Sequence, residues 1–178
     1  MDFSQNHFEL FGLPQSYALD RGQLDAAYRE LQNKVHPDRF AAQPDAEQRV
    51  AMQWATQVNE AYQTLKHPVS RGVYLLKLQG IEALDANNTK MAPAFLMQQM
   101  EWREALDDAR GDPAALDDVR RTMNDEREEL LAAIERAIDE TRDHAQAAAL
   151  VRQLMFIDRF ASEIGHADEA VHAPRASA

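Results

Sequence analysis

The chain contains no cysteine among its 178 residues. This absence excludes disulfide bonds, thiolate-bound metal and a cysteine nucleophile, and it fits a reducing compartment. Glycine and proline are scarce, at six and seven residues, which indicates a mostly helical fold. No apolar run is long enough to span a bilayer, and the amino-terminal residues lack the basic and apolar regions of a secretory signal. We therefore expect a soluble, cytoplasmic, all-α protein.

Basic residues are outnumbered by acidic ones, 19 Lys and Arg against 30 Asp and Glu. The formal net charge is −11, which disfavours binding to nucleic acid or to an anionic membrane. The deficit is uneven, because residues 1–80 hold 8 Lys and Arg against 9 Asp and Glu, whereas residues 81–178 hold 11 against 21. A nearly neutral first half and an acidic second half predict two units with different partners.

The tripeptide His36-Pro37-Asp38 stands between two segments with helical spacing of apolar residues. Proline removes a backbone donor and pushes the preceding residue out of the helical region, so a helix is expected to end at Val35 or His36. The turn that follows then presents an imidazole and a carboxylate to solvent. By itself the tripeptide fits either a protein-docking corner or an ordinary exposed loop.

Helical patterns on both sides of this turn predict an antiparallel hairpin with short helices beside it. A short helix is expected over residues 7–13, ended by Gly12 and Pro14, and Asp20 is expected to cap a helix that ends at the turn. After a loop over residues 39–44, a long helix starts at Asp45 or Ala46, and a further short helix covers residues 69–79. The apolar stripe of the long helix is expected in the core: Val50, Trp54, Val58, Ala61, Tyr62 and Leu65.

This arrangement resembles a J-domain, the module that stimulates ATP hydrolysis by DnaK-type chaperones. His36, Pro37 and Asp38 match its motif residue for residue, and Arg39 and Phe40 follow. The resemblance implies a chaperone-binding surface made of these residues together with basic residues of the preceding helix. The set is His36, Pro37, Asp38, Arg29, Lys34 and Arg39.

The second half predicts a three-helix bundle after a linker over residues 81–93. Its helices are expected over residues 94–109, from Pro113 to about Glu140, and from a cap at Asp143 to Ile164, where Gly165 ends the last one. Residues 166–178 show no periodic pattern and are expected to be disordered. The predicted domains are therefore residues 1–80, 94–165 and a tail.

The first helix of the bundle has more apolar surface than one core needs. Phe95, Trp102, Leu106 and Ala109 share one face, whereas Leu96, Met97 and Met100 lie on the opposite side among charged residues. The second face fits a protein contact site, or burial by another element. Phe156 points off the core stripe of the last helix, and fits either the same patch or the rim of the core.

The chain as a whole is similar to the HscB family, the J-type co-chaperones of bacterial iron–sulfur cluster assembly. The similarity extends over residues 7–165 and is carried by FELFGLP (8–14), RGVYLL (71–76) and AFLMQQMEWRE (94–104). It implies that the second half binds an IscU-like iron–sulfur scaffold protein. The implied scaffold-binding residues are Leu96, Met97, Met100, Glu101, Arg103, Glu104 and Phe156.

The resulting hypothesis is a co-chaperone that stimulates an HscA-like, DnaK-type ATPase and delivers the IscU-like scaffold to it. Two alternatives remain: a general J-domain adaptor for another client, or a structural helical adaptor without ATPase stimulation. No nucleophile motif, phosphate-binding glycine loop or metal-ligand spacing occurs, and an exposed turn that carries His36 and Asp38 implies no pocket. We therefore expect no enzymatic activity, no metal and no cofactor.

Overall fold

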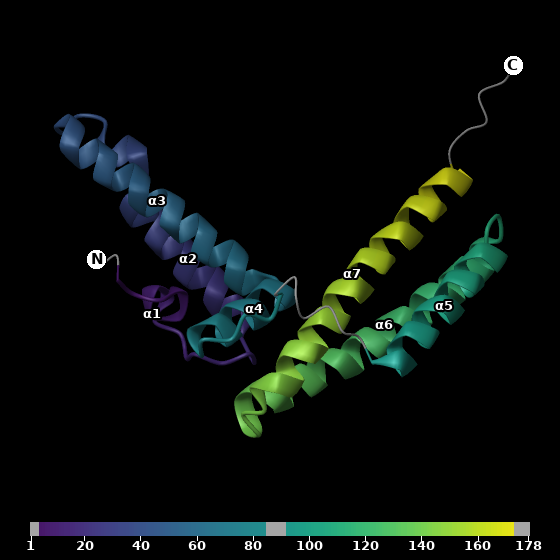
Figure 1. Cartoon of the computed structure of the whole chain (residues 1–178). Coiled ribbons are helices and arrows are strands. Elements are labelled where there is room, and N and C mark those ends of the chain that lie inside the picture. Colours follow the sequence, from purple (N-terminus) through teal and green to yellow (C-terminus); the bar gives the residue numbers. More distant parts are fainter. Residues whose placement is uncertain (1–3, 85–91, 173–178) are drawn as a thin grey trace, which may run out of the picture. The chain divides into compact units, whose positions relative to one another are not determined.

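The computed structural model describes residues 4–84 and 92–172 of the chain. All regular structure within these ranges is helical, as expected from the composition, and the chain divides into two compact units, residues 1–80 and 81–178 (Figure 1). Within the described ranges no helix has the length and apolar character needed to cross a membrane. The helices are α1 (His7–Phe11), α2 (Arg21–Val35), α3 (Asp45–Lys66), α4 (Pro68–Leu78), α5 (Pro93–Asp108), α6 (Pro113–Glu135) and α7 (His144–His172).

The helix starts in the first unit follow local capping chemistry. The Asn6 side chain accepts hydrogen bonds from the backbone N–H groups of Phe8 and Glu9, and the Glu9 carboxylate accepts one from the Asn6 N–H in return. The Asp20 carboxylate accepts from the Gln23 N–H at 3.0 Å, as predicted for the start of α2. Gly12 ends α1 with φ 63°, a conformation that favours glycine.

Helices α2 and α3 lie antiparallel, with α1 and α4 against one end of the pair (Figure 1). Two tyrosines hold the pair together, because the Tyr28 and Tyr62 rings stack with centroids 4.0 Å apart. The Tyr28 hydroxyl donates to Asn59 Oδ1 and the Tyr62 hydroxyl donates to Asp25 Oδ1, both at 2.8 Å. These contacts fix α2 and α3 against each other, and the turn that joins the two helices lies at the far end of the pair.

The predicted core of the hairpin is largely correct, with two exceptions: Tyr62 is half-buried, stacked on Tyr28, and Val50 is exposed. Trp54, Val58, Ala61 and Leu65 are buried along α3. Val50, which we expected on the same stripe, is 46% exposed, so this prediction is wrong. Val50 lies at the edge of the buried stripe of α3, next to the buried Ala51, and it lines an open groove together with Val35 and Phe40.

In the second unit, α6 and α7 form an extensively packed antiparallel pair, and α5 lies beside α6 (Figure 1). The Asp112 carboxylate accepts hydrogen bonds from the N–H groups of Ala114 and Ala115 at the start of α6. Asp143 accepts from the Gln146 N–H at the start of α7, as predicted. Residues Arg136–Glu140 continue α6 as one π-helical turn. The fully buried core is aliphatic and aromatic: Leu116, Met123, Ile134, Val151, Leu154, Phe160 and Ile164.

The predicted end of the last helix is wrong. Helix α7 continues through Gly165 to His172, so the backbone of residues 166–172 is helical where we expected a disordered tail. A single glycine costs a helix only about 1 kcal/mol relative to alanine, and the alanine and glutamate that follow it favour the helix. Residues 173–178 of the predicted tail, and residues 85–91 of the predicted linker, lie outside the described part of the chain.

Candidate functional site: an exposed turn and an exposed helix face

The turn between α2 and α3 has the geometry that the sequence predicts. Helix α2 ends at Val35, His36 has φ −58° and ψ 126°, and a short 3₁₀ helix, Pro37–Phe40, takes up the first part of the loop we expected. The His36 and Asp38 side chains are 51% and 89% exposed. Both are therefore accessible to another protein at the tip of a rigid hairpin.

Hydrogen bonds order this turn from within. The Asp38 backbone N–H donates to His36 Nδ1 at 3.3 Å, which leaves the imidazole Nε2 as the ring donor toward solvent. The Arg39 guanidinium donates to the Asn33 carbonyl at 3.0 Å, satisfying one of the open acceptors at the end of α2. The turn is consequently held in one conformation by its own residues.

Two of the basic residues expected beside the turn lie on α2. Arg29 and Lys34 are exposed. The Lys34 ammonium donates to the Glu30 carboxylate at 2.6 Å, and this hydrogen bond lowers the pKa of Glu30. Because Glu30 partly neutralises Lys34, the positive field along α2 is weaker than the number of basic residues suggests.

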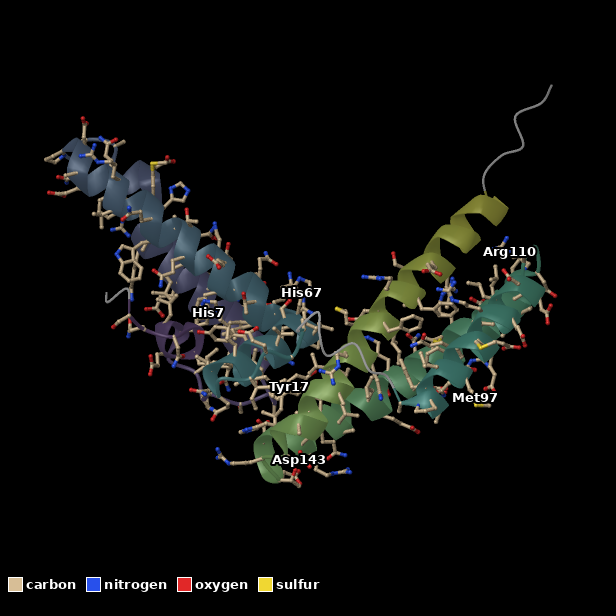
Figure 2. All side chains as sticks on the ribbon, in the orientation of Figure 1. His7, Tyr17, His67, Met97, Arg110 and Asp143 are labelled. Atoms are coloured by element: carbon tan, nitrogen blue, oxygen red, sulfur yellow. The ribbon has the colours of Figure 1, made fainter. Side chains whose placement is uncertain are left out.

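The second predicted surface lies on α5. Its inner side buries Phe95, Trp102 and Leu106, as predicted. Its outer side exposes Leu96 by 48% and both Met97 and Met100 by 64% (Figure 2 labels Met97 on α5). Three exposed charged residues flank these apolar side chains: Glu101, Arg103 and Glu104.

Phe156 differs from the other predicted patch residues, because it belongs to an aromatic cluster between α5 and α7. Its ring lies 5.8 Å from Phe95, 6.5 Å from Trp102 and 6.4 Å from Phe160, measured between centroids. The residue is half-buried. It therefore presents one edge to the surface and packs α5 onto α7 with the rest.

A polar contact between α5 and α6 lies beneath the same helix. Gln98 Nε2 is 2.8 and 2.7 Å from the two carboxylate oxygens of Glu126, and the Trp102 indole also donates to this carboxylate. Burial raises the pKa of Glu126, and the neighbouring carboxylates of Glu129 and Glu101 raise it further, against the two hydrogen bonds. The sequence analysis did not predict this contact. The one signal for it is that a buried Trp102 indole N–H needs a hydrogen-bond acceptor.

Comparisons with known proteins cover both surfaces. A family model described as the DnaJ domain matches residues 6–74, and one described as the HSCB C-terminal oligomerisation domain matches residues 91–165. A co-chaperone protein HscB homolog from Burkholderia mallei (strain SAVP1) is 53% identical over 167 residues, covering 93% of this chain and 95% of that protein. The chain belongs to the HscB family of J-domain co-chaperones.

Solved structures of HscB proteins agree with this assignment. Chaperone HscB from Vibrio cholerae has a TM-score of 0.84 and 36% identity, covering 94% of this chain and 99% of that chain. The human co-chaperone protein HscB has a TM-score of 0.89 and 30% identity, covering 94% and 84%. The resemblance seen in the sequence is thus confirmed, and the J-domain implies a DnaK-type chaperone as partner.

The HscB relatives are named co-chaperones. Within residues 4–84 and 92–172 no three His, Asp or Glu side chains lie close enough together to hold a metal ion. The two surfaces differ in polarity: the first unit presents a polar, ordered turn, and the second presents an apolar helix face.

The position of Phe156 predicts a mainly structural effect of its removal. We expect Phe156→Ala to lower the free energy of unfolding of the second unit by about 2–3 kcal/mol, because three aromatic contacts and a half-buried ring are lost. Urea denaturation followed by circular dichroism measures it. Met100→Ala, at an exposed site of the same unit, is the control and should stay within about 0.5 kcal/mol of wild type. Equal stability of the two variants would contradict the packing role.

Proposed function

We propose that the chain stimulates the ATPase of an HscA-like, DnaK-type chaperone through its first unit and delivers an IscU-like iron–sulfur scaffold to it through its second. The observation that carries the proposal is the presence, in one HscB-family chain, of an ordered turn with exposed His36 and Asp38 side chains and of an exposed apolar face on α5. The absence of cysteine favours a cytoplasmic site of action and a protein that transfers its client without itself holding a cluster.

The proposed chaperone contact centres on the turn. His36 and Asp38 offer a ring donor and a carboxylate at fixed spacing, and Pro37 fixes the backbone between them. Arg29, Lys34 and Arg39 add positive charge, which chiefly speeds the encounter with an acidic surface. Hydrolysis itself is carried out by the chaperone.

The proposed scaffold contact centres on the exposed side of α5. Leu96, Met97 and Met100 supply apolar area, and the flexible methionines can adapt to the partner's shape. Glu101, Arg103 and Glu104 supply a charged rim that selects orientation, and the exposed edge of Phe156 adds to the apolar centre.

Delivery requires that one molecule binds both partners at the same time, because the covalent link turns the second encounter into an intramolecular one. A mixture of two variants tests this requirement. One is His36→Gln, defective in the turn, and the other carries Leu96→Ala, Met97→Ala and Met100→Ala. We expect the mixture to restore less than about a tenth of the scaffold-dependent ATPase stimulation given by wild type at the same total concentration.

Steady-state ATPase of the purified chaperone, with and without the scaffold, gives the readout. Wild type at half concentration is the control for dilution, and should retain stimulation. Full stimulation by the mixture would show that the two surfaces act independently, and delivery by a single molecule would then be rejected.

A further inference from the structure

The inner side of α5 is held at few points. Only Phe95, Trp102 and Leu106 are buried among the residues of this helix, Pro93–Asp108. Two helical turns separate the first two of them, and Gln98 lies in the interval. The contacts of Gln98 therefore add to the anchoring that the aromatic cluster with α7 gives to α5.

Glu126 of α6 contacts this interval at two successive turns of α5. Its two carboxylate oxygens accept from Gln98 Nε2 at 2.8 and 2.7 Å, and the carboxylate also accepts from the Trp102 indole. Gln98 and Trp102 are four residues apart and therefore lie on the same side of the helix. Hydrogen bonds to a charged acceptor are among the stronger ones, and they weaken steeply when the donor turns away from the acceptor.

The exposed face of α5 lies on the opposite side of the helix from the contact with Glu126. With 3.6 residues per turn, the centre of Leu96, Met97 and Met100 lies about 180° around the helix axis from the midpoint of Gln98 and Trp102. Any rotation of α5 about its axis that breaks the contact with Glu126 also changes the direction in which the exposed apolar face points. The inner contact and the outer face are thus coupled through one rigid helix.

We propose that Glu126 is a positioning residue for the scaffold-binding face: by accepting from Gln98 and Trp102 it sets the rotation of α5 and keeps Leu96, Met97 and Met100 turned outward. The inference rests on the proposed scaffold contact and adds to it a residue that does not itself touch the scaffold. Glu126 acts from α6, beneath the helix.

The experiment compares full-length wild type with Glu126→Ala and Glu126→Gln. Alanine at position 126 removes both acceptor oxygens. Glutamine at position 126 keeps one oxygen that accepts from the Trp102 indole, and its NH₂ group can donate to the Gln98 carbonyl oxygen once the Gln98 amide has rotated. Affinity is measured by isothermal titration calorimetry with a purified IscU-type scaffold protein. The ¹³C methyl signals of Met97 and Met100 report the environment of the outer face without any partner. Glu128→Ala, an exposed position two residues along α6, is the matched control.

We expect Glu126→Ala to weaken scaffold binding about tenfold and to shift both methyl signals, while Glu126→Gln stays within about threefold of wild type and Glu128→Ala matches it. Rescue by glutamine separates positioning through hydrogen bonds from a direct charge contact with the scaffold. Equal weakening by alanine and glutamine would overturn the proposal in favour of charge. Wild-type affinity and unchanged methyl signals in Glu126→Ala would overturn it altogether.

Two further variants keep the test decisive. Should Glu126→Ala unfold, Gln98→Ala removes one donor from the other side of the contact, and it should weaken binding about threefold and shift the same methyl signals. The variant that lacks the side chains of Leu96, Met97 and Met100 tests the scaffold contact itself. If that variant binds as wild type does, the proposed function is wrong, and the methyl signals still decide whether Glu126 orients α5.

Discussion

Replacing His36 with glutamine is expected to lower the stimulation of the partner chaperone's ATPase by at least about tenfold, equivalent to ~1.4 kcal/mol of lost transition-state stabilisation. The imidazole is half-exposed at the tip of the hairpin, and its Nδ1 accepts the Asp38 N–H at 3.3 Å. Glutamine is similar in size to histidine, but it cannot hold a ring donor in the same direction. The effect should therefore fall on the chaperone contact.

The measurement is steady-state ATP hydrolysis by the purified DnaK-type chaperone over a range of co-chaperone concentrations. His67→Gln is the matched control, because His67 is an exposed histidine of the same unit at the end of α3 (Figure 2). Both variants should unfold at the wild-type temperature, since neither side chain is buried. If His36→Gln stimulated within about twofold of wild type, the turn would have lost its proposed role.

Truncating the apolar face of α5 should produce the other large effect. Changing Leu96, Met97 and Met100 to alanine together is expected to weaken binding of the IscU-like scaffold about a hundredfold. Each side chain loses several buried methyl or methylene groups in the complex, worth about 1 kcal/mol per residue, and roughly 3 kcal/mol corresponds to two orders of magnitude in Kd. Stability should change little, because all three side chains are exposed in the free protein.

Isothermal titration calorimetry with the purified scaffold measures this loss. The matched control changes Val50 and Met52 to alanine, two exposed apolar residues on α3, which are 46% and 60% exposed. Phe156 is left intact because its removal disturbs the aromatic cluster. Similar affinity losses in both variants would mean that exposed apolar area as such, and not the α5 face, drives association, and the proposed contact would be wrong.

The hairpin illustrates how far local chemistry reaches. Pro37 cannot donate and restricts the residue before it, so α2 had to end at Val35, and Asp20 capped its start as predicted. Exposure of His36 and Asp38 followed from the same rules. The periodicity of α5 likewise separated the buried Phe95 and Trp102 from the exposed Leu96, Met97 and Met100, because side-chain direction repeats every 3.6 residues.

Errors arose where a residue's surroundings belong to another helix or depend on competing weak preferences. Val50 has helical spacing with Trp54, but it lies at the edge of the buried stripe, where an open groove shared with Val35 of α2 and with Phe40 leaves it exposed. Gly165 signals a helix end, yet the cost of one glycine is small beside the helical preference of its neighbours, so α7 continued. Neither the exposure of Val50 nor the continuation of α7 past Gly165 can be read from the local sequence pattern.

The sequence by itself determined the helical class, the turn that carries His36-Pro37-Asp38 and the two faces of α5, since each depends on backbone sterics or on helical periodicity along one segment. Only the tertiary structure decided that Phe156 of α7 packs against α5, and that Glu126 accepts from both Gln98 and Trp102. These contacts join residues between 24 and 61 positions apart in the sequence. They depend on how the helices pack against one another, which the pattern of a single segment does not determine.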